Sequence, residues 1–345
     1  MSEFIRVLIV DDSAFARKVL REILATSTQV DVVGTARDGE EALQMTADLQ
    51  PDLVLCDLLM PKLDGVGYVR RQMQKRPLPI LIVSAAAQDA SEVIEALSAG
   101  AIDVVRKPTA LATDDLRAIR DDLVAKIKAM AHAPVKSWTD EIARPLPRIT
   151  VKSKRGSVAI VVLGISTGGP QALRRLMPLL PADFPVPMAI VLHMPVGYTA
   201  LYAEKLNEVC KLEIKEAEEG DIVKAGRVLL APAGRHLGFR RSPTGEIVAR
   251  LSMQPLEKIH RPSVDVLFQS AAENFHEGVL AVVMTGMGDD GLEGAAWVKA
   301  QGGTVLTESE KSCVIYGMPR SVAEAGLSDA AITLDEMAEA ISSRL

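Results

Sequence analysis

The second half of the sequence contains a serine, a histidine and an aspartate that could form the catalytic triad of a hydrolase. Ser166 lies in the segment GISTG, residues 164–168, which fits the G-x-S-x-G pattern of a nucleophile on a sharp strand-to-helix turn. His193 and Asp290 each follow an apolar run that is typical of a buried strand. Nucleophilic catalysis needs a base within reach of the hydroxyl and an acid that orients the base. We therefore expect these three side chains to meet at one rim of a sheet.

The glycine-rich turn is open to a second interpretation. A strand, a glycine-rich turn and a helix also form the phosphate-binding loop of nucleotide-binding proteins. A nucleotide site would need neither His193 nor Asp290, and a single histidine after a strand often makes only one backbone hydrogen bond. Three groups of complementary chemistry, each after a separate strand, are harder to explain in that way. The whole pattern favours a serine-dependent hydrolase.

Two adjacent carboxylates, Asp289 and Asp290, follow the last of these apolar runs. Neighbouring side chains in an extended loop point to different sides. We therefore expect only one of them to reach the Nδ1 side of His193. The other is then a solvated residue, a turn former or a helix cap.

A second group of polar residues lies in the first 110 residues, again after apolar runs. Three carboxylates at one rim would repel one another unless a cation joined them, and oxygen ligands of this kind suit Mg²⁺. A lysine and a hydroxyl on the opposite side could hold an anion such as phosphate. An aspartate after a strand can also simply cap a helix, but five polar residues at strand ends favour a shared site. They are Asp11, Asp12, Asp57, Ser84 and Lys107.

The elements that must position these residues alternate between apolar runs and segments of helical periodicity. This alternation is typical of α/β domains with parallel sheets. In the first half it predicts a doubly wound sheet whose site lies at the carboxyl ends of the strands. The predicted strands of that half are residues 6–10, 30–36, 53–56, 80–83 and 102–105. The second half repeats the pattern, with strands starting near residue 158 and at residues 189–192 and 280–285, and a helix over residues 171–180.

The periodicity stops between the two halves. Three prolines, Pro134, Pro145 and Pro147, interrupt this segment, and its end is locally basic. Both features are typical of a tether between domains. We therefore expect a first domain over residues 1–130, a linker over residues 131–156 and a second domain over residues 157–345.

The composition of the chain limits the classes of protein to which it can belong. The 345 residues, 48% of them hydrophobic, are enough for two domains with separate cores. No apolar run could span a bilayer, and the first residues lack the features of a signal peptide. Three scattered cysteines fit a reducing compartment and have no zinc-ligand spacing. A net charge of −6, and a second half that alternates strand and helix, argue against a nucleic-acid partner. We expect a cytoplasmic protein without direct membrane insertion.

The first domain resembles the response-regulator receiver family over residues 4–125. The acidic pair in LIVDDS, the apolar run ending at Asp57, the serine after LPILIV and the dipeptide Lys107-Pro108 carry the resemblance. It implies a flavodoxin-like fold in which a histidine kinase phosphorylates Asp57. Asp12 and Asp57 are then implied as Mg²⁺ ligands, and Asp11 as a residue that supports the metal. Ser84 and Lys107 are implied to contact the phosphoryl oxygens.

Two further points follow from this resemblance. The family usually has a cis peptide bond after its lysine, which makes Lys107–Pro108 a candidate for one. Three residues before the lysine, the family commonly has an aromatic side chain that moves on activation. Here that residue is Val104, so the usual reporter of the switch is missing.

The second domain resembles the chemotaxis protein-glutamate methylesterases. The matching motifs lie within residues 158–325 and are GISTGGP, LHMP, APAGRH, HRPSVDVLF, TGMGxDG and CVIYGMPR. The chain order Ser, His, Asp differs from the Ser, Asp, His order of α/β-hydrolases. We therefore expect a doubly wound α/β esterase domain with a different topology.

This resemblance also implies roles for individual residues. By motif, Ser166 is the nucleophile, His193 the base and Asp290 the acid, because TGMGxDG fixes the position of Asp290 and leaves that of Asp289 variable. The amide of Met287 is implied as a donor to the oxyanion. Residues that fit the family but have no derived role are Thr167, His236 and the segment 261–265.

The function implied by the resemblance is hydrolysis of glutamate γ-methyl esters on transmembrane chemoreceptors, with release of methanol. The family also deamidates certain receptor glutamines, which is the same acyl transfer with ammonia as the leaving group. No cofactor is expected for this reaction. In the family, the unphosphorylated receiver obstructs the active site, and phosphorylation by the chemotaxis histidine kinase relieves the obstruction.

Overall fold

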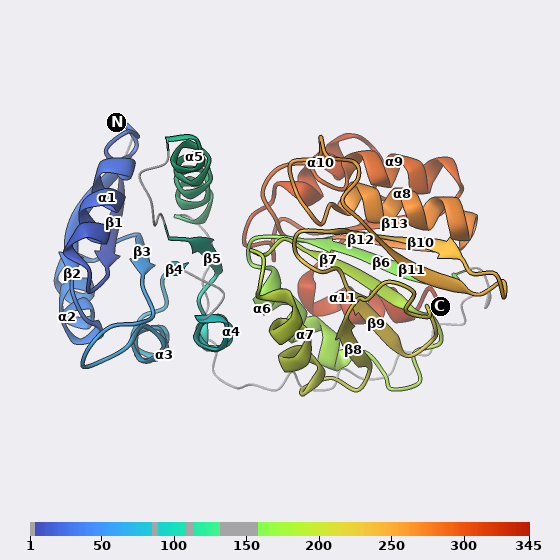
Figure 1. The fold of residues 1–345 in the computed structure, drawn as a ribbon, viewed down its shortest axis with the longest axis horizontal. Helices are drawn as coiled ribbons and strands as arrows, with labels where there is room; N and C mark the ends of the chain where they lie inside the picture. Colours follow the sequence, from blue (N-terminus) through green and yellow to red (C-terminus); the bar gives the residue numbers. More distant parts are fainter. Residues whose placement is uncertain (1–3, 85–88, 108–112, 132–157) are drawn as a thin grey trace. The chain divides into compact units, whose positions relative to one another are not determined.

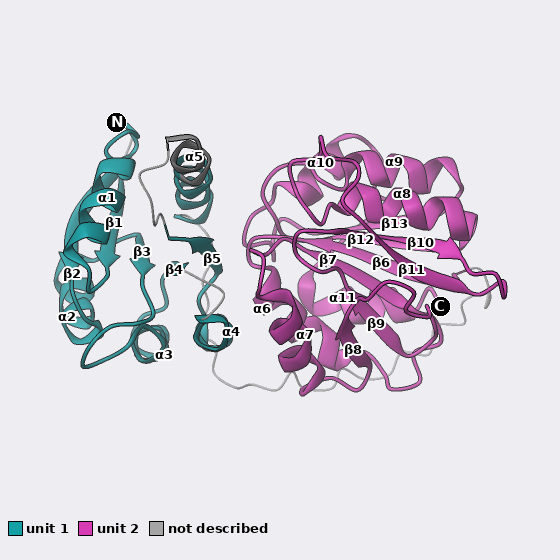
Figure 2. Cartoon of the chain, viewed as in Figure 1, with its two compact units in different colours: residues 1–142 teal, residues 143–345 magenta. Residues whose placement is uncertain are grey.

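The computed structural model of the chain describes residues 4–84, 89–107, 113–131 and 158–345. The chain divides into two compact units, residues 1–142 and 143–345 (Figure 2). Residues 132–156 of the predicted linker lie outside the described residues, as does Pro108 of the candidate cis bond. The predicted domain boundaries therefore stay predictions. No helix in the described ranges combines the length and apolar character needed to cross a bilayer.

The first unit contains a five-stranded parallel sheet in the order β2-β1-β3-β4-β5, with helices in the connections (Figure 1). This is the predicted doubly wound, flavodoxin-like topology. All five predicted strands are present, with bounds within one residue of those predicted. The elements are β1 (Ile5–Val10), α1 (Ala14–Leu24), β2 (Val30–Ala36), α2 (Gly39–Leu49), β3 (Leu53–Cys56), α3 (Gly65–Lys75), β4 (Ile80–Ser84), α4 (Ala90–Ala99), β5 (Asp103–Arg106) and α5 (Thr113–Met130).

Local sequence signals explain why these elements begin where they do. Ser13, Asp38 and Asp64 each accept a backbone hydrogen bond at the start of α1, α2 and α3, as capping side chains do. Apart from the exposed Arg6, the central strands β1 and β3 consist of buried apolar residues, because helices cover both faces of a parallel sheet. The residues that directly follow β1, β3 and β5, namely Asp11, Asp57 and Lys107, are thereby held at one edge of the sheet.

The second unit contains a seven-stranded parallel sheet in the order β14-β13-β12-β6-β7-β9-β8 and a separate antiparallel pair, β10-β11 (Figure 1). The three predicted strands correspond to β6, β7 and β12, and β12 ends two residues earlier than predicted. The outer strands and the antiparallel pair were not predicted from the sequence. The strands are β6 (Ile160–Ile165), β7 (Met188–Leu192), β8 (Glu213–Glu216), β9 (Arg227–Leu230), β10 (His236–Arg241), β11 (Ile247–Ser252), β12 (Val279–Val283), β13 (Thr304–Glu308) and β14 (Ala330–Ile332).

Helices cover both faces of the seven-stranded sheet, so this unit is also doubly wound (Figure 1). Helices α8, α9 and α10 lie on one face, and α6, α7 and α11 lie on the other. The predicted helix over residues 171–180 is α6 followed by the short 3₁₀ helix η2. The helices are α6 (Gly169–Leu176), η2 (Met177–Leu179), α7 (Thr199–Asn207), α8 (Val264–Phe275), η3 (His276–Gly278), α9 (Leu292–Ala300), α10 (Met318–Glu324) and α11 (Leu334–Ser342).

The central strand β6 pairs with β7 on one side and β12 on the other. The chain builds β7, β8 and β9 on one side before it crosses to β12, so the strand order reverses at β6. Open α/β sheets bind their ligands at the carboxyl ends of the strands at such a reversal.

Helix α8 packs unusually close to β6. A Cβ atom added to Gly164 would lie only 2.2 Å from Cγ1 and 2.7 Å from Cγ2 of Val264, the first residue of α8. Both residues are in the buried interior of the unit. The first glycine of the GISTG segment therefore serves the contact between strand and helix.

We expect Gly164→Ala to lower the free energy of unfolding of the second unit by about 1–3 kcal/mol, because the new methyl group overlaps Val264. Urea denaturation followed by circular dichroism measures the loss. Val264→Ala removes both γ carbons and makes room for the methyl group. The double variant should therefore be more stable than the sum of the two single losses indicates. If the losses of unfolding free energy in the two single variants simply add in the double variant, the close contact between residues 164 and 264 is contradicted.

Candidate active site and phosphorylation site

The pairing of β6 with β7 places Ser166 and His193 next to each other. Ile165 and Leu192 are partners in the parallel register, so the two residues directly follow paired positions at the carboxyl ends of neighbouring strands. The His193 N–H donates to the Ile165 carbonyl at 3.1 Å, which continues the pairing by one residue. The structure therefore places the predicted nucleophile and base at adjacent strand ends.

The turn after β6 exposes Ser166 partly while its backbone stays fixed. The Ser166 N–H donates to the Thr285 carbonyl at 2.9 Å, and its carbonyl accepts from the Gly169 N–H at 2.7 Å. Gly168 has a φ of 82°, and a Cβ atom there would lie 2.7 Å from Val314. Only glycine suits this position, because it needs both a left-handed backbone and no side chain.

Asp290 meets His193 at the same rim. Asp290 Oδ2 and His193 Nε2 are 2.8 Å apart, across 97 residues of sequence. The expectation that the acid would reach Nδ1 is thus wrong, because the loop after β12 approaches the ring from its Nε2 side. His193 Nδ1 is buried and has no hydrogen-bond partner among the described residues. With Nε2–H donating to the carboxylate, Nδ1 is the nitrogen that can accept a proton.

Asp290 is buried and fully surrounded by donors. Besides His193, its Oδ2 accepts from the Val264 N–H at 2.8 Å, and its Oδ1 accepts from the Ser263 hydroxyl at 2.8 Å and the Asp265 N–H at 3.0 Å. Burial alone raises the pKa of Asp290. The hydrogen bond from His193, with those from the amides of Asp265 and Val264, outweighs burial and holds the pKa of Asp290 well below its usual range. The carboxylate is therefore ionised next to the imidazole.

Asp289 lies differently from its neighbour. It is exposed, and its carbonyl accepts from the Leu292 N–H at 2.9 Å in the turn that leads into α9. This position agrees with the expectation that only one of the two carboxylates reaches His193. Asp289 has the role of a turn residue.

The segment that contains Met287 lies directly against Ser166. A Cβ atom on Gly286 would be 2.7 Å from the Ser166 Cβ, and the Gly286 carbonyl accepts from the Gly317 and Met318 N–H groups at 3.1 and 2.8 Å. The Met287 N–H, which comes next, donates to no acceptor in the part of the chain that the structure describes. This amide is therefore available to a ligand near Ser166.

His236 and segment 261–265, for which no chemical role follows from the sequence, form the hydrogen-bonded surroundings of Asp290. The Ser263 N–H donates to His236 Nδ1 at 3.2 Å, and His236 Nε2 lies 3.2 Å from the Pro255 carbonyl. Burial lowers the pKa of His236, which favours the neutral ring that accepts at Nδ1. Segment 261–265 thus contains Ser263, Val264 and Asp265, all of which donate to Asp290. Ser263 is also the N-cap residue of α8, a signal that sequence reasoning could have used.

A buried glutamate that the sequence did not single out holds the end of β12. Glu308 accepts from the Thr285 N–H and the Ser312 hydroxyl, each at 2.9 Å, and burial raises its pKa. Thr285 in turn donates its hydroxyl to the Thr167 carbonyl at 3.0 Å. Thr167 is therefore a buried neighbour of Ser166 that is hydrogen-bonded to the segment after β12. The only sequence signal was a glutamate at the end of an apolar run.

His260 lies over the ring of His193. Its ring stacks on that of His193 with 4.2 Å between ring centroids and 19° between planes. His260 is exposed at the surface, whereas His193 is mostly covered. The stack restricts the plane of the His193 ring.

In the first unit, Asp11, Asp57 and Lys107 meet at the carboxyl edge of the sheet. Lys107 Nζ lies 2.7 Å from Asp11 Oδ2 and 2.9 Å from Asp57 Oδ2. Burial raises the pKa of Asp57 despite its hydrogen bond from Lys107. Burial lowers the pKa of Lys107, but the hydrogen bonds to Asp11 and Asp57 outweigh burial, so the pKa is raised overall. The lysine therefore lies among the carboxylates, rather than on the side opposite to them as predicted.

These carboxylates fit a divalent cation. Among the described residues, Asp11, Asp12 and Asp57 each offer an oxygen within 4.8 Å of the others. Asp12 is exposed, and the other two are buried, so one side of the group faces solvent. Such a site suits Mg²⁺, which keeps several waters and takes few protein ligands.

The hydroxyl of Ser84 lies at the same edge but donates to Asp89 Oδ2 at 2.9 Å. Asp89 is the residue before α4, so this bond joins the end of β4 to the start of that helix. Val104, at the position of the family's aromatic residue, is buried in β5.

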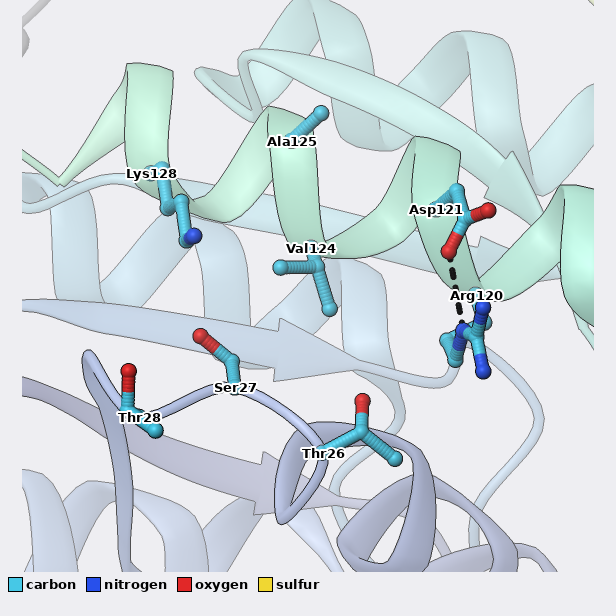
Figure 3. Close-up of a pocket in the computed structure, with 8 residues that line it drawn as sticks. All are labelled: Thr26, Ser27, Thr28, Arg120, Asp121, Val124, Ala125 and Lys128. Atoms are coloured by element: carbon cyan, nitrogen blue, oxygen red, sulfur yellow. Dashed lines mark hydrogen bonds and ion pairs between the residues drawn. The ribbon is translucent and has the colours of Figure 1, made fainter.

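A groove of about 530 Å³ lies elsewhere in the first unit (Figure 3). Residues 26–28 line one side of it, and α5 lines the other with Arg120, Asp121, Val124, Ala125 and Lys128. Residues 26–28 precede β2, whereas Asp57 follows β3, and the strands are parallel. The groove is therefore at the edge of the sheet opposite to the carboxylates and is not part of their site.

Comparison with known proteins gives concordant matches for both units. The model of the CheB methylesterase family matches residues 161–341, and that of the response regulator receiver domain matches residues 7–119. A protein-glutamate methylesterase/protein-glutamine glutaminase 5 from Myxococcus xanthus is 48% identical, with 96% of each chain covered. A protein-glutamate methylesterase/protein-glutamine glutaminase from Halalkalibacterium halodurans is 40% identical, with 99% of this chain and 98% of the relative covered.

A solved structure agrees with the second unit. The catalytic domain of the Thermotoga maritima CheB methylesterase is 40% identical, with a TM-score of 0.53 over 55% of this chain and 100% of that one. The matches together span both units and nearly the whole sequence. The chain therefore belongs to the CheB methylesterase family, as a protein-glutamate methylesterase/protein-glutamine glutaminase with a response regulator receiver domain.

Proposed function

We propose that Ser166, His193 and Asp290 are the nucleophile, the base and the orienting acid of this family's hydrolysis. The observation that carries the proposal is the 2.8 Å hydrogen bond between His193 and Asp290 at the strand end beside Ser166. It leaves His193 Nδ1 as the nitrogen that takes the serine proton. The ionised acid holds the ring in this tautomer and stabilises the imidazolium that forms.

In the proposed mechanism, the Ser166 oxygen attacks the γ-carbonyl carbon of a methyl-esterified glutamate while His193 Nδ1 accepts the hydroxyl proton. The same nitrogen then gives this proton to the departing methoxide, so methanol leaves and an acyl-serine remains. Water attacks the acyl carbon with His193 again as base, which releases the glutamate and restores Ser166. With a glutamine side chain, ammonia leaves in place of methanol. The mechanism requires no cofactor.

The Met287 amide is proposed as a donor to the oxyanion of the tetrahedral intermediate. It follows Gly286, which lies against Ser166, and the bonds from Gly317 and Met318 to the Gly286 carbonyl fix its peptide group. A donor that is already in place when charge develops stabilises the transition state without further reorganisation.

For the receiver, we propose that Asp57 accepts a phosphoryl group from a chemotaxis histidine kinase. Asp12 and Asp57 would hold Mg²⁺, supported by Asp11, and the bound ion would neutralise charge on the phosphoryl oxygens. Lys107 is already within 2.9 Å of Asp57 and would contact the phosphoryl group. Ser84 would contact it after its hydroxyl leaves Asp89.

The proposed partners follow from this chemistry and from the family. The substrate is the cytoplasmic helical region of methyl-accepting chemoreceptors, and the phosphodonor is the kinase of the same pathway, so we propose that the protein acts in the cytoplasm. The domains are proposed as residues 1–130 and 157–345 with a linker between them. In its unphosphorylated form the receiver is proposed to obstruct the active site.

Ser166→Ala tests the mechanism most directly. Only the nucleophilic oxygen is removed, so we expect no methanol release from a methylated receptor and no loss of phosphate incorporation. Methanol release by wild type and variant, with a small phosphodonor and Mg²⁺, is the measurement. Ordinary turnover by the alanine variant would rule out the serine mechanism.

A paired substitution separates the two adjacent carboxylates. Asp290→Asn is expected to lower turnover on the order of 10⁴-fold, because the amide favours the wrong tautomer of His193. Asp289→Asn, a matched change in an exposed turn, should remain within a few-fold of wild type. The steady-state rate of methanol release distinguishes them. Equal small losses in both variants would mean that another group orients His193.

Asp57→Asn tests the phosphorylation site. The amide cannot form the acyl phosphate, so the variant should take up no phosphate and should lose the increase in methanol release that the phosphodonor causes. Radiolabelled phosphate incorporation and methanol release are measured in parallel, and the rate without phosphodonor is the baseline. Undiminished phosphate incorporation would place the acceptor at another residue.

A further inference from the structure

The helices α8 and α9 begin with an exchange of carboxylates. Asp290, just before α9, accepts from the Val264 and Asp265 N–H groups at the start of α8. In return, Asp265 Oδ1 accepts from the Gly291 N–H at 2.9 Å and the Gly294 N–H at 2.8 Å at the start of α9. Each helix therefore supplies the capping carboxylate of the other, and one of the two carboxylates is the proposed triad acid.

Asp265 has little freedom to move within this arrangement. Its residue is 8% exposed, and its second oxygen, Oδ2, accepts from Lys258 Nζ at 2.9 Å. A Cβ atom on Gly294 would lie 2.9 Å from the Asp265 Cα, so the two helix starts are in close contact. A shift of Asp265 would break three hydrogen bonds from buried or partly buried donors, which is costly.

We propose that Asp265 is a positioning residue of the catalytic triad. Its bond to the Gly291 N–H fixes the peptide group that directly follows Asp290, and its own N–H holds Asp290 Oδ1. Asp265 thereby sets where Asp290 Oδ2 meets His193 Nε2. Catalytic groups must be held to a fraction of an ångström, and a 1 Å displacement can cost about 100-fold in rate. This inference rests on the proposed role of Asp290.

The test compares Asp265→Ala with a conservative and a remote variant. Asp265→Ala should lower kcat for methanol release about 100-fold with KM within threefold, because orientation is lost and substrate contacts are not. In Asp265→Asn the amide oxygen can still accept from Gly291 and Gly294, so kcat should recover to within about tenfold of wild type. An asparagine variant as slow as the alanine variant would overturn the proposal.

Asp329 offers a matched control. Like Asp265 it accepts from a lysine, Lys299 at 2.7 Å, and from the backbone, here through one N–H, that of Val305 at 2.8 Å, against two for Asp265. It lies at the amino end of β13 and not at the catalytic rim. Asp329→Ala should lower the Tm while kcat stays within threefold of wild type. If both alanine variants lose activity in proportion to their Tm, Asp265 is only a structural residue.

A double-mutant cycle tests whether Asp265 acts through Asp290. Once Asp290→Ala has removed the acid, the added Asp265→Ala should cost less than threefold, because there is no carboxylate left to orient. If the fold losses in kcat of the two single variants multiply in the double variant, Asp265 acts independently of the triad, and the proposal is overturned.

Nitrogen-15 NMR of the histidine rings gives a readout that needs no substrate. In wild type and Asp329→Ala, His193 should show the Nε2–H tautomer bonded to Asp290, and Asp265→Ala should show a mixture of tautomers. An unchanged His193 tautomer in Asp265→Ala would overturn the inference. If wild type releases no methanol, the substrate assignment fails, while the ring spectra still decide the role of Asp265.

Discussion

The hydrogen bond between His193 and Asp290 depends on a carboxylate that is kept ionised inside the protein. A buried charge is costly unless hydrogen bonds replace its hydration. Asp290 has four such donors, namely the His193 ring, the Ser263 hydroxyl and the first two amides of α8. The start of α8 must therefore lie at the rim where β6 and β7 end. Much of the packing around β6 can be understood from this requirement.

Strand pairing and two glycines, Gly164 and Gly286, allow the start of α8 and the loop after β12 to lie at this rim. Gly164 has no side chain, so Val264 can pack directly on β6 and the first turn of α8 reaches the acid. The pairing of β6 with β7 and β12 puts the proposed nucleophile, base and acid after three neighbouring strands. The loop after β12 then places Gly286 against Ser166 and Asp290 against His193. One set of contacts thus serves both the stability of the unit and the geometry of the proposed triad.

In the receiver, the charge of buried carboxylates is offset by a lysine side chain and not by backbone amides. The Lys107 ammonium lies between the carboxylates of Asp11 and Asp57, and it offsets their repulsion at a partly buried edge. Ser84 is bonded to Asp89 at the start of α4. A phosphoryl group on Asp57 would compete for both Lys107 and Ser84. The bond between Ser84 and Asp89 is a direct link from this site to α4.

The sequence alone determined the two α/β folds, the strands that end at Ser166, His193 and Asp57, and the choice of Asp290 by motif. These features are local, since an apolar run and the residue after it are read within a few positions. The outer strands β8, β9, β13 and β14 escaped prediction. Strands β8, β9 and β14 have only three or four residues, β8 reads as a charged segment, and β13 contains two threonines and a glutamate. Only the tertiary structure decided that Asp290 meets Nε2 and that Asp265 and Asp290 exchange helix caps. These contacts join residues 25 to 97 positions apart, so they depend on how helices pack on the sheet and not on any local pattern.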